Sequence, residues 1–187
     1  MEITWLGHSS VCINSRDVLL VTDPYDNSDG EFMPTRSAEI VISSRTGDKH
    51  SNVAAVTGNP RIVNGPGEYE ISHFYISGTG TSGHVEDQVG GPVNTIYTIR
   101  AEGLVISHLG ALTKKIPPAQ MDILRQTQIL TIPISGEDIL SASEAQEIIS
   151  AIQPRVLIPI QYGDGGPNKL DSPDKFLSEL GITEPLV

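Results

Sequence analysis

The stretch Ile40–Asn52, IVISSRTGDKHSN, joins a short apolar segment to a polar loop that is rich in charge. Ile40–Ile42 is β-branched throughout and predicts the end of a buried strand. The charged and titratable side chains that follow are Arg45, Asp48, Lys49 and His50. The apolar pattern resumes at Asn52–Val56, which could form one short helix. A polar loop between a buried strand and a helix is a common place for a functional site, and a solvated turn is the alternative interpretation.

The length and charge of the chain limit what it can be. Its 187 residues suffice for one domain with a full hydrophobic core, and no linker divides them, so we expect a single domain over residues 1–187. With 23 acidic against 12 basic residues the formal net charge is -11. This charge argues against a nucleic-acid backbone or an anionic membrane surface as the main partner. The N-terminal residues have neither a basic segment nor a long apolar one, so we expect a soluble, cytoplasmic protein.

The single cysteine, Cys12, cannot form an internal disulfide. It lies between Val11 and Ile13 in a predicted strand, so we expect it to be a small core residue. Nothing nearby in the sequence indicates a thiol with a depressed pKa.

The predicted elements begin with strands and end with alternating helices and strands. Alternating or continuous apolar patterns predict strands at residues 2–6, 10–14, 17–22, 40–42, 61–63, 68–71, 74–77, 94–99, 104–108, 128–134 and 156–160. Helical spacing predicts helices at residues 117–126, 141–152 and 173–180, and Ser141 and Glu144 form a capping-box pattern at the start of the second. Residues 25–37 and the glycine-rich residues 78–91 are expected to be loops. This order predicts an α/β (α+β) fold of mixed sheets with helices outside.

Several motifs in this order resemble the metallo-β-lactamase superfamily, and within it the small branch similar to ascorbate-phosphate lactonase. They are Leu6–Ser10 (LGHSS), Leu20–Pro24 (LVTDP), Gly65–Glu70 (GPGEYE), Asn94–Tyr97 (NTIY), His108–Gly110 (HLG) and Ile158–Tyr162 (IPIQY). The resemblance implies an αββα sandwich with a metal cleft at the loop edge of its two sheets. It also implies zinc-dependent hydrolysis and, in related branches, assembly into homo-oligomers.

The same resemblance indicates a degenerate metal motif. In the family, the strand that ends here at Ser44 is followed by a His-x-His-x-Asp-His motif that binds two adjacent metals. The resemblance puts Arg45 at the first His, Gly47 at the second, Lys49 at the Asp and His50 at the last His.

Three further ligand positions of the family lie later in the chain. The His of the flexible loop falls on Ser82 without gaps, or on His84 if the loop is two residues shorter. The bridging Asp falls on Ala111, and the late His falls on Gln161. His50 and His84 are therefore the remaining candidate metal ligands.

This donor set predicts that no metal cofactor is bound, although zinc is expected for the family. Zinc needs three or four N, O or S donors in a tight shell, and one His gives weak affinity. Arg45 and Lys49 would also bring positive charge to the place of the cations and repel them. Our hypothesis is that Arg45 or Lys49 pairs with Asp23 and partly replaces the metals electrostatically.

Other polar residues are expected near the same cleft. His8, Asp23 and Asp48 should line it if the family fold holds, with His8 orienting neighbouring loops. His108 lies next to the bridging position without being a usual ligand, and His73 is expected to be an exposed strand residue.

The leading hypothesis is a metallo-β-lactamase-fold pseudoenzyme that acts as a non-catalytic binding or scaffold protein, with no catalytic residue assigned. One alternative is a metal-dependent hydrolase with a residual site around His50, using His84 and Asp23 or Asp48. Another is a small-anion sensor using Arg45 and Lys49. The expected partner is a small anionic ligand or another protein.

Overall fold

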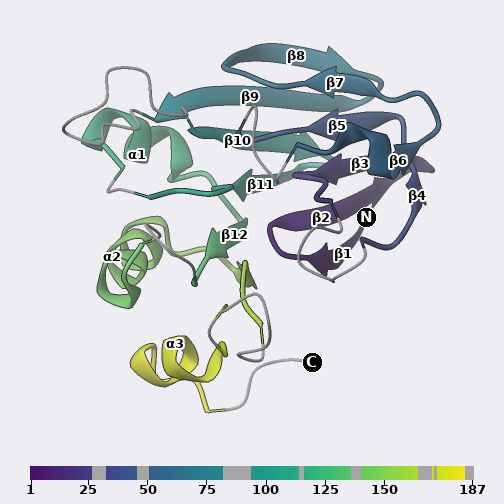
Figure 1. The fold of residues 1–187 in the computed structure, drawn as a ribbon. Coiled ribbons are helices and arrows are strands. Elements are labelled where there is room, and N and C mark those ends of the chain that lie inside the picture. Colours follow the sequence, from purple (N-terminus) through teal and green to yellow (C-terminus); the bar gives the residue numbers. More distant parts are fainter. Residues whose placement is uncertain are drawn as a thin grey trace, which may run out of the picture.

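The computed structural model describes residues 1–26, 33–45, 51–81, 94–113, 116–135, 140–163, 170 and 172–183. Two main sheets face each other, and the α-helices of the described residues lie on one side of the molecule (Figure 1). The expected sandwich of two mixed sheets is confirmed. No helix in the described ranges has the length and apolar composition of a membrane span.

The first sheet contains five strands in the order β1-β2-β3-β5-β7. Their bounds are β1 Glu2–Gly7, β2 Ser10–Ser15, β3 Val18–Thr22, β5 Ile40–Ile42 and β7 Arg61–Val63. The strands β1, β2 and β3 pair antiparallel through tight turns, whereas β3, β5 and β7 pair parallel. Parallel neighbours end at the same edge of a sheet, so the residues that follow β3 and β5 lie close together.

The second sheet contains six strands in the order β13-β12-β11-β10-β9-β8. Their bounds are β8 Gly67–Ile71, β9 Phe74–Thr81, β10 Asn94–Ala101, β11 Leu104–His108, β12 Ile129–Pro133 and β13 Val156–Ile160. It repeats the pattern of the first sheet, because β8 to β11 pair antiparallel and β11, β12 and β13 pair parallel.

The main hydrophobic core lies between the two sheets. Alternate residues of each strand point inward, as the pleat of a strand requires. The first sheet contributes Val11, Ile13, Leu20, Ile40, Ile42 and Val63, and the second contributes Phe74, Ile76, Tyr97, Ile99, Ala101, Ile106 and Ile160.

The outer faces of the two sheets are covered differently. Helices α1 (Pro118–Leu124), α2 (Ala142–Ile152) and α3 (Asp174–Glu179) supply side chains to the apolar cluster on the second sheet. In the described part of the chain, the first sheet is covered by the 3-10 turn η1 (Val53–Ala55) and the small sheet of β4 (Arg36–Ser37) and β6 (Val56–Thr57). Helix α2 starts with the predicted capping box between Ser141 and Glu144.

Four local expectations need correction. Arg36–Ser37, expected in a loop, forms β4, because it pairs with Val56–Thr57 of β6. Asn52–Val56 forms one 3-10 turn and the start of β6, because Val56 pairs with Arg36 and cannot continue a helix. Residues 78–81, expected in a loop, continue β9, because they pair with β10 up to Thr81 opposite Asn94. His73 lies half-buried in the turn between β8 and β9, where its Nε2 is 2.8 Å from the Ser15 hydroxyl.

Candidate functional site

Polar residues gather where strands of both sheets end at one edge of the sandwich. Asp23 follows β3, Ser44 lies two residues after β5, and His108 ends β11. All three side chains are buried, with at most 1% of their surface exposed. Their sequence positions differ by up to 85 residues, so only the fold brings them together.

The Asp23 carboxylate is the centre of this group. Its Oδ1 accepts a hydrogen bond from the Ser44 backbone N–H at 2.6 Å, and its Oδ2 accepts one from the Ser44 hydroxyl at 2.7 Å. The Oδ2 atom also lies 2.8 Å from Nε2 of His108. A carboxylate this deeply buried is stable only with such partners, so these contacts stabilise the junction of the two sheets.

His108 extends the network to the next strand. Its Nδ1 lies 2.7 Å from the hydroxyl of Thr131 on β12, and Thr131 is 1% exposed. Because Nε2 faces a carboxylate, the ring donates a hydrogen bond there, and the Thr131 hydroxyl donates to Nδ1 when the ring is neutral. A carboxylate, an imidazole and a hydroxyl in this order resemble a catalytic triad, but the Thr131 hydroxyl is buried and cannot reach a substrate. The chain of contacts therefore works as a structural connection.

The segment after β11 is fixed against the same group. The Asn94 side chain donates to the Leu109 carbonyl at 3.0 Å and accepts from the Ala111 backbone N–H at 3.1 Å. Gly110 has a φ of +60°, and a Cβ there would collide with the side chain of Ser44. The close approach of Gly110 to Ser44 therefore requires glycine on both steric and conformational grounds.

Tyr97 closes the group from the core side. The side chain is fully buried, and its hydroxyl donates to the Ser43 carbonyl at 3.1 Å. Burial raises the pKa of Tyr97, and the negative charge of Asp23 raises it further. The phenol is therefore held in its neutral form as a hydrogen-bond donor.

Of the residues expected in the cleft, His8 and Gln161 lie together at a second junction of the sheets. The backbone carbonyl of His8 accepts from the Gln161 N–H at 2.7 Å and from the Trp5 indole at 2.9 Å. The Gln161 side chain accepts from the Ser9 hydroxyl at 3.1 Å. The His8 ring contacts the Tyr25 ring at an interplanar angle of 58°, with 4.5 Å between ring centroids. The expected role of His8 in orienting loops stays a prediction.

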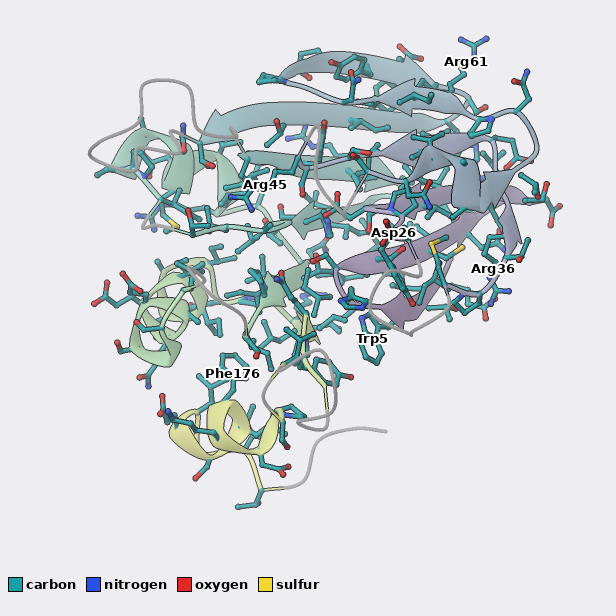
Figure 2. The ribbon with its side chains drawn as sticks, viewed as in Figure 1. Trp5, Asp26, Arg36, Arg45, Arg61 and Phe176 are labelled. Atoms are coloured by element: carbon teal, nitrogen blue, oxygen red, sulfur yellow. The ribbon has the colours of Figure 1, made fainter. Side chains whose placement is uncertain are left out.

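Arg45 follows Ser44 directly and is half-buried, and Figure 2 shows its side chain on the α1 side of the strands. Asp48, Lys49, His50 and His84 lie outside the described residues. The expected pairing of Arg45 or Lys49 with Asp23 stays a prediction.

Sequence reasoning did not identify His108 and Ser44 as the partners of Asp23. A signal was present, because each of the three residues comes at or just after the end of a predicted strand. The sequence does not show that the ends of β3 and β11 lie opposite each other across the sandwich.

The match to known proteins agrees with this architecture. A family model described as a beta-lactamase superfamily domain matches residues 2–161 of the chain. The chain belongs to the beta-lactamase superfamily. A solved structure from Thermotoga maritima, described as a Zn-dependent hydrolase of the metallo-beta-lactamase superfamily, has a TM-score of 0.78 and 28% identity, covering 95% of this chain and 84% of its own.

Two curated proteins are similar in sequence to most of this chain. A UPF0173 protein of Pyrococcus abyssi is 28% identical over 182 residues, which cover 89% of this chain and 85% of the relative. A UPF0173 metal-dependent hydrolase of Methanopyrus kandleri is 22% identical over 223 residues, with 97% and 94% covered. The Methanopyrus kandleri relative, described as a metal-dependent hydrolase, therefore resembles this chain along nearly its whole length.

The described residues at the implied ligand positions do not fit a zinc centre. Arg45 offers a cation, Ala111 a methyl group that is 2% exposed, and Gln161 a neutral amide already bonded to Ser9. The nearby donors Asp23 and His108 are bonded to each other. Within the described ranges, no group of three or more His, Cys, Asp or Glu side chains is arranged to hold a metal ion.

Proposed function

We propose that this chain is a non-catalytic member of the superfamily that acts by binding, as a ligand-binding or scaffold protein. The observation that carries the proposal is the engagement of Asp23, because both of its carboxylate oxygens accept hydrogen bonds from Ser44 and one of them also lies 2.8 Å from Nε2 of His108. At the adjoining position where the resemblance implies a bridging carboxylate, Ala111 has only a buried methyl group.

The chemistry of the donor set supports this proposal. Metal-dependent hydrolysis draws on a bound metal that lowers the pKa of water and polarises the substrate. A cation at one ligand position and a methyl group at another would hold such a metal poorly. This chain would then lack the activated water that hydrolysis in the family requires, although it keeps the fold of the family.

Elemental analysis of the protein purified without chelator tests the proposal. We expect less than one equivalent of zinc, iron or manganese per chain, and no recovery of metal after dialysis against zinc. A stoichiometric metal would overturn the proposal in favour of a hydrolase with a residual site around His50 and His84. His50→Ala and His84→Ala variants would then show whether these residues hold the metal.

A small anionic ligand is the class that we propose for this cleft. Arg45 is half-buried and carries a permanent positive charge at the edge of the sandwich where Ser44 lies. A guanidinium group can bind phosphate or carboxylate with two parallel hydrogen bonds. Lys49, four residues later in the sequence, would add a second charge. A protein partner is the alternative occupant.

Thermal shift with inorganic phosphate, phosphorylated sugars and carboxylates tests the ligand class. We expect at least one anion to raise the melting temperature of the wild-type protein and to have a smaller effect on Arg45→Gln. Arg61→Gln is the matched control, because Arg61 is exposed on the edge strand β7. Equal shifts in the wild type and Arg45→Gln would contradict an anion site at Arg45.

A further inference from the structure

Three tight turns meet at the end of the sandwich opposite the Asp23 group. They connect β2 to β3, β8 to β9 and β10 to β11, so one comes from the first sheet and two from the second. Strand β10 runs from Asn94, which contacts the segment beside the Asp23 group, to Ala101, beside these turns. An eight-residue strand separates the two ends by roughly 23 Å.

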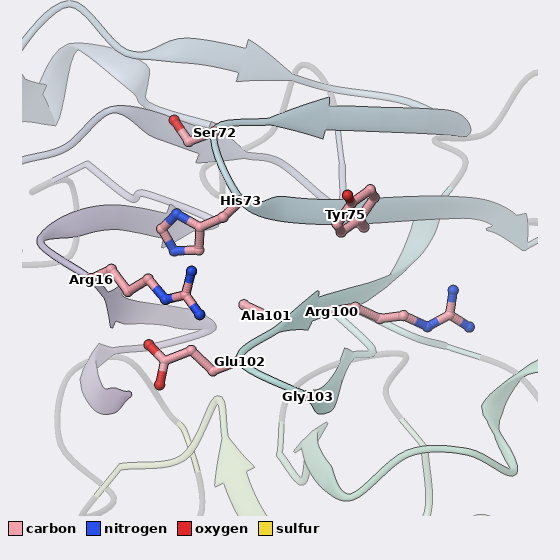
Figure 3. Close-up of a pocket in the computed structure, with 8 residues that line it drawn as sticks. All are labelled: Arg16, Ser72, His73, Tyr75, Arg100, Ala101, Glu102 and Gly103. Atoms are coloured by element: carbon pink, nitrogen blue, oxygen red, sulfur yellow. The ribbon is translucent and has the colours of Figure 1, made fainter.

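The turns enclose a surface pocket of about 630 Å³. Its described lining contains the side chains of Arg16, Ser72, His73, Tyr75, Arg100 and Glu102. Figure 3 shows Arg16 between His73 and Glu102 on one side of the pocket, and Tyr75 on the other side. This volume is within the range of small-molecule sites.

Arg16 is the distinctive member of this lining. Its guanidinium forms no hydrogen bond or ion pair with another residue in the part of the chain that the structure describes. An arginine in a pocket whose five N–H donors lack protein acceptors is available for a planar or tetrahedral oxyanion.

The acidic residue of the lining is already engaged. The Glu102 carboxylate accepts from the Ser15 hydroxyl at 2.6 Å and from the Met1 ammonium group at 3.2 Å. These contacts, the Ser15 hydrogen bond first, lower the pKa of Glu102. The positive charge of Arg16 also lowers this pKa, but it comes last among the causes, after the Ser15 hydrogen bond and the Met1 ammonium group. The N–H donors of Arg16 therefore stay available for another anion.

The backbone holds the lining in fixed positions. Arg16, Ser72 and Glu102 have φ values of +47°, +57° and +51°, so a non-glycine residue in each turn adopts the left-handed conformation. Each turn spans only two residues between paired strands, as between Ser15 and Val18. Such turns allow little backbone movement, and a rigid lining reduces the entropy lost when a ligand binds.

We propose that this pocket is a second binding site, which takes a small organic oxyanion, a carboxylate or a phosphate monoester, with Arg16 as its principal donor. The ring of Tyr75, which is 54% exposed, offers an apolar face to the carbon part of the ligand. Arg100 adds positive charge, which it shares with an adjoining hollow lined by Glu68 and Glu70. This site does not depend on the anion site proposed at Arg45, because the two lie at opposite ends of the sandwich.

Titration of the arginine Nε–H and backbone amide NMR signals tests the site. The probes are inorganic phosphate, phenyl phosphate and benzoate, each added at constant ionic strength with chloride as the balancing anion. We expect saturable shifts at Arg16, His73 and Gly103 with phenyl phosphate or benzoate, and weaker binding of inorganic phosphate, which cannot contact Tyr75. The Arg16→Gln variant should bind at least tenfold more weakly, whereas Arg61→Gln and Arg45→Gln should bind like the wild type.

Specific outcomes would overturn the assignment. Shifts that grow linearly with each anion, or that are the same in Arg16→Gln, would show that the pocket does not bind small oxyanions. Loss of binding in Arg45→Gln with retention in Arg16→Gln would place the anion in the cleft instead. The Arg16→Lys variant keeps the charge without the planar fork, so binding at wild-type strength there would contradict a guanidinium-specific contact.

Discussion

Nε2 of His108 lies 2.8 Å from Oδ2 of Asp23, and this contact joins the end of β11 in the second sheet to the end of β3 in the first. Both side chains are almost completely buried. We expect His108→Ala to lower the free energy of unfolding by about 3 kcal/mol, because the Asp23 carboxylate would stay buried without its imidazole partner. Urea unfolding followed by circular dichroism measures this change.

The matched control for this variant is His73→Ala. His73 also contacts a hydroxyl, that of Ser15, but it lies half-buried in a turn, so we expect a loss of about 1 kcal/mol or less. The double variant Asp23→Asn with His108→Ala should lose less than the sum of the two single losses. Additive losses would show that the two groups are not coupled.

Gly110 provides a test of the close approach to Ser44. A Cβ at Gly110 would collide with the Ser44 side chain, and the φ of +60° adds a conformational penalty. Gly103 has a φ of +76° and nothing within 4 Å of an added Cβ, so Gly103→Ala isolates the conformational part. We expect Gly103→Ala to cost about 1 kcal/mol and Gly110→Ala to cost about 2 kcal/mol more. Equal losses, measured by thermal unfolding, would show that the strand ends separate easily.

Much of the sheet architecture could be predicted from the sequence, because its cause is local. The pair β10 and β11 is an apolar alternation on both sides of Glu102 and Gly103, which suit a tight turn. The capping box of α2 was predictable for the same reason, since Ser141 and Glu144 interact within one turn.

Features that depend on tertiary pairing were not predictable in this way. Residues 78–81 contain two glycines and show no period, yet pairing with β10 makes them a strand. The contact of Asp23 with His108 spans 85 positions and depends on how the sheets face each other. The implied positions of Arg45, Ala111 and Gln161 came from resemblance, and the described structure adds contacts of Ala111 and Gln161.

The buried phenol of Tyr97 predicts a specific dependence of stability on pH. Burial raises its pKa in the folded protein above the value of about 10 in the unfolded chain. Below pH 10 the phenol keeps its proton in both the folded and the unfolded protein, so the contribution of Tyr97 to stability is fully present. Above pH 10 the unfolded chain releases this proton while the folded protein retains it, so the free energy of unfolding should fall as the pH rises.

Replacing Tyr97 by Phe removes this titration. We expect Tyr97→Phe to be less stable at neutral pH by about 1 kcal/mol, because the Ser43 carbonyl loses its donor, and to show a shallower decline above about pH 10. Tyr75→Phe, at an exposed position, should follow the wild-type curve. Parallel curves for the wild type and Tyr97→Phe would contradict a raised pKa in the folded protein.

Cys12 lies in the apolar cluster on the outer face of the first sheet, where it is 6% exposed beside residues such as Leu6 and Val41. Burial raises the pKa of its thiol, which lowers the thiolate fraction at neutral pH. We therefore expect a thiol reagent to modify Cys12 at a rate set by opening of the fold, and rapidly only in urea.

Cys12→Ser places a hydroxyl in the same apolar cluster and should be less stable than Cys12→Ala by about 1–3 kcal/mol. Fast labelling of the folded wild type, together with equal stabilities of the two variants, would contradict a closed cluster around Cys12.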